Sequence, residues 1–99
     1  MRDYFANKVA LITGSARGIG YAIAAELGRR GASVVLSDVL DDTLEESAAR
    51  LADEGVDVFA ARTDVTDPEA CKDLVQRTLA VACSLDVRLN KACNSIVAM

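Results

Sequence analysis

Histidine is absent from all 99 positions of the chain. Its absence excludes the catalytic arrangements in which histidine activates a serine or a cysteine. With no histidine available, and with cysteines only at positions 71, 83 and 93, the sequence argues against a structural zinc site. We therefore expect Cys71, Cys83 and Cys93 to be small buried hydrophobic residues in a reducing compartment.

Long apolar runs and clusters of one charge are missing as well. No apolar run reaches the roughly eighteen residues needed to span a bilayer, and residues 1–5 lack the apolar core of a signal peptide. We therefore expect a cytoplasmic protein. The net charge of −4, without a lysine or arginine cluster, argues against nucleic acid or an anionic membrane as a partner. With 52% apolar and 26% charged residues, the composition is typical of one globular domain.

Three of the six glycines lie in the stretch from Thr13 to Gly20, which reads Thr-Gly-Ser-Ala-Arg-Gly-Ile-Gly. A short apolar run, 8–12, precedes it and a helical pattern follows. Glycine at such a junction permits a tight turn, close approach of backbone N–H groups to a pyrophosphate, and close packing of helix on strand. The helix N-terminus adds unpaired N–H groups and a partial positive charge. Asp38 ends the next apolar run, where a carboxylate can accept hydrogen bonds from both ribose hydroxyls. The combination predicts a dinucleotide-binding loop; the alternative is a glycine-rich connection that binds nothing.

Strand and helix patterns alternate along the chain. We expect a helix over about 18–29, a strand over 33–37, a second helix capped by Asp41 or Asp42 and ended by Gly55, and a strand over 56–60. A third helix begins at Asp67-Pro68, and 85–89 is a poor fourth strand. The predicted buried positions of the second helix are Leu44, Ala48, Leu51 and Ala52, and those of the third are Cys71, Leu74, Val75, Thr78, Leu79 and Ala82.

This alternation specifies an α/β fold with a parallel sheet and right-handed crossovers. We predict a Rossmann-like sheet of three to four strands with helices on both faces, truncated to a partial dinucleotide-binding domain over residues 1–99. The first two helices would cover one face and the third helix the other. The thinly covered second face would leave an apolar patch, so we expect marginal stability and self-association into a homo-oligomer.

The spacing Thr13-Gly14-x-x-x-Gly18-x-Gly20 resembles that of the short-chain dehydrogenase/reductase family. Asp38 matches the ribose-binding acid of that family, Asp64-Val65 matches the pair beside the adenine ring, and Asn90 falls in the segment of the fourth strand. Without the resemblance, Asp64 could equally be a plain turn or cap residue. The resemblance implies an NAD(P)-dependent oxidoreductase acting on an alcohol or carbonyl substrate. The cofactor-binding residues it implies are Thr13, Gly14, Ser15, Arg17, Gly18, Ile19, Gly20, Asp38, Asp64, Val65 and Asn90.

Two residues bear on the choice of cofactor. Asp38 would repel the 2′-phosphate of NADP, which favours NAD. Arg17 lies where NADP-preferring members of the family often carry a basic residue, although it could equally be solvated or pair with Asp38. We predict NAD, with NADP less favoured, and no metal.

The C-terminal part departs from the family pattern. Residues 90–93 read Asn-Lys-Ala-Cys where the family has Asn-Asn-Ala-Gly, and Arg88 would place a charge inside a covered strand. The family takes its catalytic serine, tyrosine and lysine from later elements, so we expect this chain to be inactive alone. Tyr4 and Lys8 have the catalytic spacing but precede the first strand, so the match is accidental.

Two other function classes remain open. One is a non-catalytic nucleotide-binding or interaction module that associates with itself or with a full-length relative. The other is a methyltransferase, whose glycine loop and second-strand acid can look similar. A P-loop phosphotransferase is disfavoured because no Lys-Ser or Lys-Thr follows the glycines.

Overall fold

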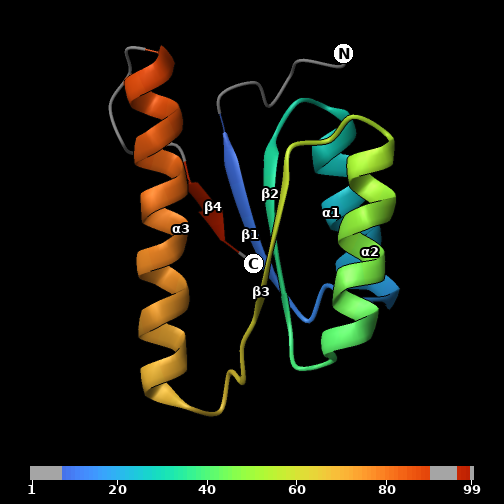
Figure 1. Ribbon diagram of the computed structural model, residues 1–99, viewed down its shortest axis with the longest axis vertical. Helices are drawn as coiled ribbons and strands as arrows, with labels where there is room; N and C mark the ends of the chain where they lie inside the picture. The colour runs from blue at the N-terminus through green and yellow to red at the C-terminus, as the bar shows by residue number, and fades with distance from the viewer. Residues whose placement is uncertain (1–7, 90–95, 99) are drawn as a thin grey trace.

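The computed structural model describes residues 8–89 and 96–98, and its elements alternate as the sequence predicts (Figure 1). The sheet contains four strands in the order β3-β2-β1-β4, and every neighbouring pair is parallel. The architecture is therefore the predicted Rossmann-like α/β fold. The elements in chain order are β1 (Val9–Thr13), α1 (Gly18–Arg29), β2 (Ser33–Asp38), α2 (Asp41–Asp53), β3 (Val58–Arg62), α3 (Pro68–Leu89) and β4 (Ile96–Ala98).

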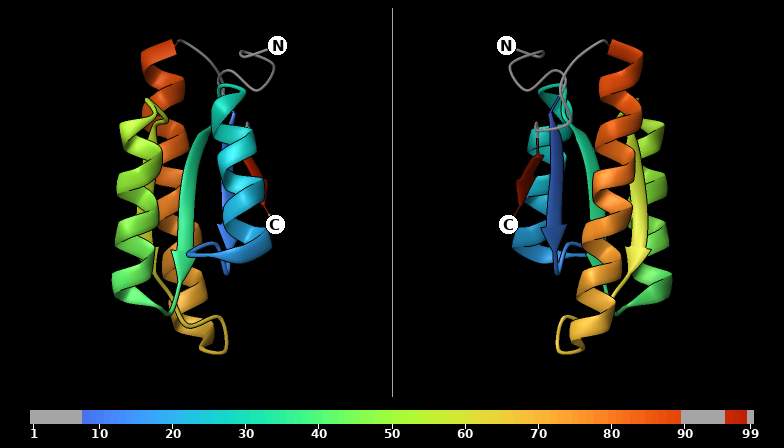
Figure 2. Two further views of the ribbon diagram at one scale, coloured as in Figure 1. Left: turned by 90° about the vertical axis from the view of Figure 1, so that its right-hand side faces the viewer. Right: turned by 90° about the vertical axis from the view of Figure 1, so that its left-hand side faces the viewer.

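The sheet register places β1 at the centre. Leu11 pairs with Val35 of β2, and Val9 pairs with Ile96 of β4 on the other edge of β1. The side views show β4 lying along β1, away from β2 and β3 (Figure 2). Strands β1 and β2 are almost continuously buried, as is typical of parallel strands covered on both faces.

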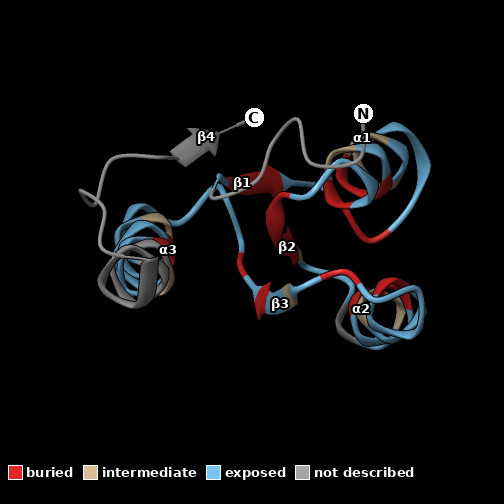
Figure 3. Ribbon diagram, turned by 90° about the horizontal axis from the view of Figure 1, so that it is seen from above, coloured by how far each residue is buried: buried red, intermediate tan, exposed pale blue. Residues whose placement is uncertain are grey.

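Two hydrophobic cores lie on opposite faces of the sheet. Helices α1 and α2 cover one face, and the buried residues line the strands and the inward sides of these helices (Figure 3). Helix α3 lies on the other face, where Leu74 packs against Leu11, Val35 and Ala61. The predicted placement of the first two helices on one face of the sheet and the third helix on the other is confirmed. The core between the sheet and the first two helices contains Ala10, Ile12, Ala24, Ala25, Val34, Leu36, Leu44 and Leu51, among others.

Helix α1 packs very closely on the sheet. A Cβ added at Gly28 would lie 2.6 Å from Val56 Cγ1 and 3.3 Å from Val34 Cγ2, so glycine is what permits this approach. An exposed ion pair between Arg29 and Glu54, 2.9 Å, joins the end of α1 to the residue that follows α2. The close approach fixes how α1, and therefore its N-terminus, sits on the strands.

The start of α2 differs from the prediction. The N-cap residue is Leu40, and no side-chain hydrogen bond caps the helix within the described residues, so capping by Asp41 or Asp42 is wrong. The preceding Asp38 instead accepts hydrogen bonds from the amides of Val39 and Leu40. Ala52, which was predicted to be buried, is exposed, whereas Ser47 belongs to the buried face of α2.

The later elements also shift. Strand β3 begins at Val58, two residues after the predicted start, because Val56 is used to pack against α1. Residues 85–89 belong to α3, and the fourth strand is Ile96–Ala98, so the strand predicted at 85–89 is wrong. A helix satisfies its backbone hydrogen bonds internally, whereas a strand at 85–89 would have placed Arg88 inside the sheet.

Helix α3 uses a narrower buried face than predicted. Asp67 Oδ1 accepts a hydrogen bond from the Glu69 amide, 3.1 Å, as expected for a cap followed by Pro68. Leu74 and Thr78 are buried and Cys71 is half-buried, but Val75 and Leu79 are 49% and 42% exposed. The side chains of Ala82 and Cys83, and all of Cys93, fall outside the described residues. In the part of the chain that is described, no helix is both long enough and apolar enough to cross a bilayer.

Candidate functional site

The predicted site residues gather where the parallel strands end. The loops after β1, β2 and β3 all lie at the lower end of the molecule in Figure 1. The loops are hydrogen-bonded to the neighbouring strand: the Ser15 amide donates to the Ser37 carbonyl and the Thr63 amide to the Asp38 carbonyl, each at 3.0 Å. Residues from three separate segments of the sequence therefore form one continuous edge.

The glycines of the first loop serve two different purposes. Gly14 and Gly18 have φ of +62° and +67°, a left-handed conformation that other residues rarely adopt, and apart from their chain neighbours no atom of the described residues lies within 4 Å of where their Cβ atoms would be. Gly20 has ordinary backbone angles, but a Cβ there would lie 2.3 Å from the Gly14 carbonyl oxygen. The first two glycines shape the turn and the third lets α1 begin directly against it.

The N-terminus of α1 is open toward solvent. Arg17 is the N-cap residue in an extended conformation, and no side-chain hydrogen bond caps the helix in the described structure. The first turn contains no acidic residue, and Arg17, Gly18 and Ile19 are exposed, with Ile19 80% accessible. The unpaired N–H groups and the positive end of the helix dipole are thus available to an anion from outside.

Ser15 lies beneath this surface. Its side chain is fully buried, and its hydroxyl donates to the Ile12 carbonyl, 2.7 Å, and accepts from the Ser37 amide, 2.9 Å. The hydroxyl therefore joins the loop to β2 and is turned away from the exposed side of the loop. Thr13, at the end of β1, is exposed at the same edge.

The carboxylate of Asp38 is already engaged by the backbone of two loops. Oδ2 accepts from the Ala16 amide at 3.0 Å, while Oδ1 accepts from the amides of Val39 at 2.7 Å and Leu40 at 3.3 Å. A carboxylate offers about four acceptor positions, so about one remains, on Oδ2. The half-buried side chain can still accept a hydrogen bond from a ligand hydroxyl.

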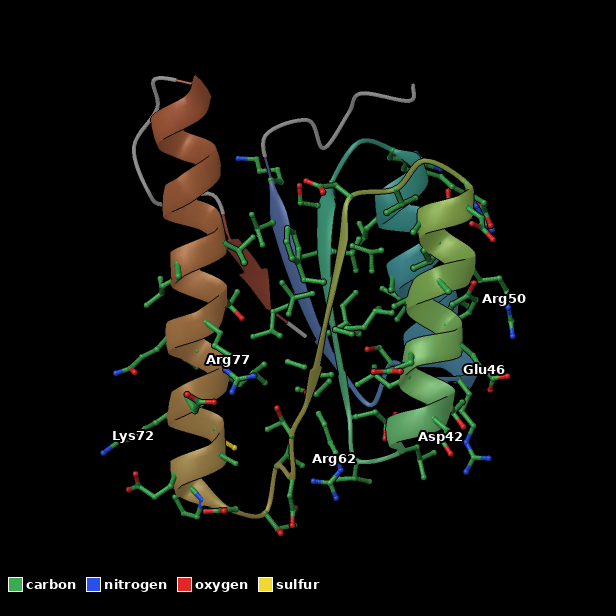
Figure 4. All side chains as sticks on the ribbon, viewed as in Figure 1. Asp42, Glu46, Arg50, Arg62, Lys72 and Arg77 are labelled. Atoms are coloured by element: carbon green, nitrogen blue, oxygen red, sulfur yellow. The ribbon has the colours of Figure 1, made fainter. Side chains whose placement is uncertain are left out.

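Asp64 and Val65 occupy the loop after β3. Asp64 Oδ1 accepts from the Thr66 hydroxyl at 2.6 Å and from the Thr66 amide at 2.9 Å. These hydrogen bonds, together with a smaller attraction from Arg62, lower the pKa of the Asp64 carboxyl. Val65 is 55% exposed, and Figure 4 shows Arg62 and Asp42 at this same end of the molecule.

Sequence reasoning missed two residues at this edge. Ala16 joins the glycine loop to Asp38 through its amide, and its carbonyl accepts a hydrogen bond from the Ser47 hydroxyl of α2. The sequence places Ser47 three residues after Leu44 and four before Leu51, on the apolar side of the helix, but it does not show what its hydroxyl contacts. The predicted site residue Asn90 lies outside the described residues and is therefore not included in this site.

The arrangement can bind an elongated ligand with an anionic group at the start of α1 and a hydroxyl group at Asp38. Within residues 8–89 and 96–98, no group of three or more potential ligand side chains could hold a metal ion. Tyr21 is half-buried on α1, and its ring lies under the Arg50 guanidinium at 5.6 Å, a cation–π contact on the side of the helix pair. Tyr21 therefore serves the packing of α1 with α2.

Comparison with known proteins agrees with this geometry. The family model for short chain dehydrogenases matches residues 8–98. An uncharacterized oxidoreductase of Bacillus subtilis is 42% identical over 86 residues, covering 87% of this chain and 34% of that protein. A short chain dehydrogenase/reductase of Burkholderia phymatum in complex with NAD has a TM-score of 0.75 and 34% identity, covering 81% of this chain and 28% of that one.

A second solved structure carries the other type of nicotinamide ligand. It is an alcohol dehydrogenase of Thermococcus sibiricus complexed with 5-hydroxy-NADP, with a TM-score of 0.70 and 42% identity, covering 74% of this chain and 32% of that one. This chain spans 34% of the length of the Bacillus subtilis relative and between 30% and 50% of the other curated relatives compared with it.

Proposed function

Because the chain belongs to the short chain dehydrogenase family, we propose that it binds the adenosine and pyrophosphate parts of NAD along the carboxyl ends of its parallel strands. The observation that carries this proposal is the uncapped, acid-free N-terminus of α1, which begins directly against the glycine loop through Gly20. The backbone N–H groups after Arg17 would hold the pyrophosphate. The residues present thus fit the cofactor that the family uses.

Asp38 supports NAD over NADP. Its remaining acceptor position would take a ribose hydroxyl, whereas a 2′-phosphate in the same place would repel the carboxylate. Arg17 is exposed, and its side chain makes no hydrogen bond that caps α1 in the described structure. Its positive charge could therefore attract the 2′-phosphate of NADP, which opposes the effect of Asp38. Similar solved structures carry NAD in one case and 5-hydroxy-NADP in another, so the fold alone does not set the preference, and we attribute it to these two side chains.

For the whole protein we propose an oxidoreductase reaction on an alcohol or carbonyl substrate. Bound NAD would supply the hydride acceptor or donor. The described residues contribute binding and orientation, and Tyr21 is committed to its contact with Arg50. We therefore expect no turnover from the 99-residue chain assayed with NAD and simple alcohols.

Calorimetric titration of the chain with NAD and with NADP tests the binding proposal. We expect NAD to bind more tightly, and Asp38→Asn to weaken NAD and narrow the difference between the two nucleotides, because it removes the charge while keeping one acceptor oxygen. Asp42→Asn is the matched control, since this exposed acid belongs to the start of α2 and not to the glycine loop or the end of β2 (Figure 4). Tighter NADP binding would overturn the specificity, and binding of neither nucleotide would overturn the function.

A second function is favoured by one observation. Val75 and Leu79 on α3 and Phe59 on β3 are large apolar side chains that are 40% or more exposed. We infer that the chain can self-associate through this surface, as an interaction module would. Association that is unaffected by nucleotide, in a chain that fails to bind NAD, would favour this function over cofactor binding.

A further inference from the structure

Ser47 is a polar residue in an apolar setting. It lies on the inner face of α2 between Leu44 and Leu51, and its side chain is 2% exposed. A buried hydroxyl destabilises the folded chain unless it is hydrogen-bonded, and the partner of this hydroxyl is the Ala16 carbonyl of the glycine loop. The second helix is thereby connected to a loop that precedes the first.

The Ala16 peptide is held from two sides. Its carbonyl accepts from Ser47, and its amide donates to Asp38 Oδ2 at 3.0 Å. Ala16 itself is 2% exposed, and it directly precedes Arg17 and the left-handed Gly18, with which α1 begins. Fixing the Ala16 peptide therefore fixes the direction in which the chain enters α1, and with it the orientation of the free N–H groups.

We propose that Ser47 is a positioning residue of the dinucleotide site: its hydroxyl, acting with Asp38, fixes the Ala16 peptide so that the N–H groups at the start of α1 are preorganised for the pyrophosphate. This inference rests on the proposed cofactor binding. A donor set that is already ordered binds an anion without first losing conformational freedom. Loss of the Ser47 hydroxyl should therefore loosen the loop and weaken the nucleotide, although Ser47 itself does not touch the ligand.

The test compares Ser47→Ala with Thr78→Val. Alanine favours a helix at least as well as serine, so the first variant should fold. The control also removes one buried hydroxyl, which donates to the Leu74 carbonyl at 2.8 Å on α3, on the opposite face of the sheet. Hydrogen exchange of the Ala16 amide is followed by NMR in the nucleotide-free chain, with the amide of Val35 in β2 as the internal reference.

We expect Ser47→Ala to speed exchange of the Ala16 amide about tenfold, as for a lost buried hydrogen bond, with Val35 unchanged. NAD should bind about five- to tenfold more weakly by calorimetry, because the ordering of the loop is then added to the binding event. Thr78→Val should change neither measurement. Ser47→Thr, which keeps the hydroxyl, should restore both, a result that a purely steric role of the side chain would not give.

Each other outcome overturns the inference. Unchanged Ala16 exchange in Ser47→Ala would show that the hydroxyl does not hold the loop, and so would a Ser47→Thr variant that behaves like Ser47→Ala. Faster exchange with unchanged NAD affinity would show that the loop order does not serve binding. If the unsubstituted chain bound neither NAD nor NADP, the proposed function itself would fail. That outcome is distinct from one in which the unsubstituted chain and Ser47→Ala bind NAD equally well, which would overturn only the role of Ser47.

Discussion

At the scale of single residues, adding a methyl group distinguishes the structural role of Gly14 from that of Gly20. The Cβ of a Gly20→Ala variant would meet the Gly14 carbonyl at 2.3 Å, and a backbone atom cannot rotate away as a side chain can. We expect a loss of about 1–3 kcal/mol in the free energy of unfolding, measured by urea denaturation, and loss of NAD binding.

Gly14→Ala is the matched comparison. It has open space around the new methyl group, so its cost comes from the positive φ alone and should be about 1–2 kcal/mol. If Gly20→Ala were as stable as the unsubstituted chain, the close contact between α1 and the glycine loop would be wrong.

Asp64 gives a prediction on pH. The hydrogen bond from the Thr66 hydroxyl is the largest cause of its lowered pKa, so Thr66→Val, which removes the hydroxyl and keeps the amide, should raise that pKa toward the ordinary value, as followed by NMR titration of the carboxyl carbon. Arg62→Gln should raise it less, because the attraction from Arg62 is the smallest contribution. Since the folded pKa is the lower one, the stabilisation is present at neutral pH and is lost as the pH falls from the ordinary pKa through the folded one. An equal or larger rise in Arg62→Gln would contradict this assignment.

The residues of the site were predictable to different degrees. Glycine at fixed spacing after an apolar run, followed by an acid at the end of the next strand, could be recognised because backbone geometry requires particular residue types there. The buried roles of Ser15 and Ser47 could not, because a serine in a sequence does not show whether its hydroxyl faces solvent or a backbone carbonyl. That distinction depends on contacts between residues 15 and 37, and between 16 and 47, which only the fold creates.

At the scale of elements, the packing of α1 against β2 and against Val56, just before β3, depends on Gly28. Replacing glycine by alanine inside a helix is ordinarily favourable by up to about 1 kcal/mol, but here the methyl group would lie 2.6 Å from Val56 Cγ1. We expect Gly28→Ala to lower the free energy of unfolding by about 1 kcal/mol. Val56→Ala should make room for the methyl group, so the double variant should be less destabilised than the sum of the two single variants. Additive effects in urea denaturation would show that the two residues are not in contact.

Elements with agreeing local signals were predicted best. The first helix was placed at its observed bounds because its glycine start, apolar period and basic C-terminus coincide. The limits of α2, β3 and the end of α3 were predicted less well, since they depend on which of several possible contacts their residues make in the folded chain. Asp38 satisfies the amides before α2, Val56 packs under Gly28 instead of joining β3, and α3 continues to Leu89 although Leu85, Val87 and Leu89 alternate as in a strand.

At the scale of the whole molecule, the exposed apolar surface of α3 should govern association. Val75→Lys places a charge where Val75 is 49% exposed, so it should lower the weight-average mass in sedimentation equilibrium without reducing stability in urea. Ala49→Lys, at an exposed position of α2, changes the net charge equally and should leave association unaltered. If both variants reduced the mass to the same extent, net charge and not the α3 surface would be responsible.

The pairing of β4 with β1 joins the two most distant parts of the described chain, because Val9 lies opposite Ile96. During synthesis, residues 9–13 emerge early and can pair with β2, but their other edge has no partner until residues 96–98 leave the ribosome. At about 5–20 residues per second, that edge remains unpaired for several seconds. Throughout that interval it can pair with a strand of another chain, which makes the nascent chain most prone to aggregation before β4 is available.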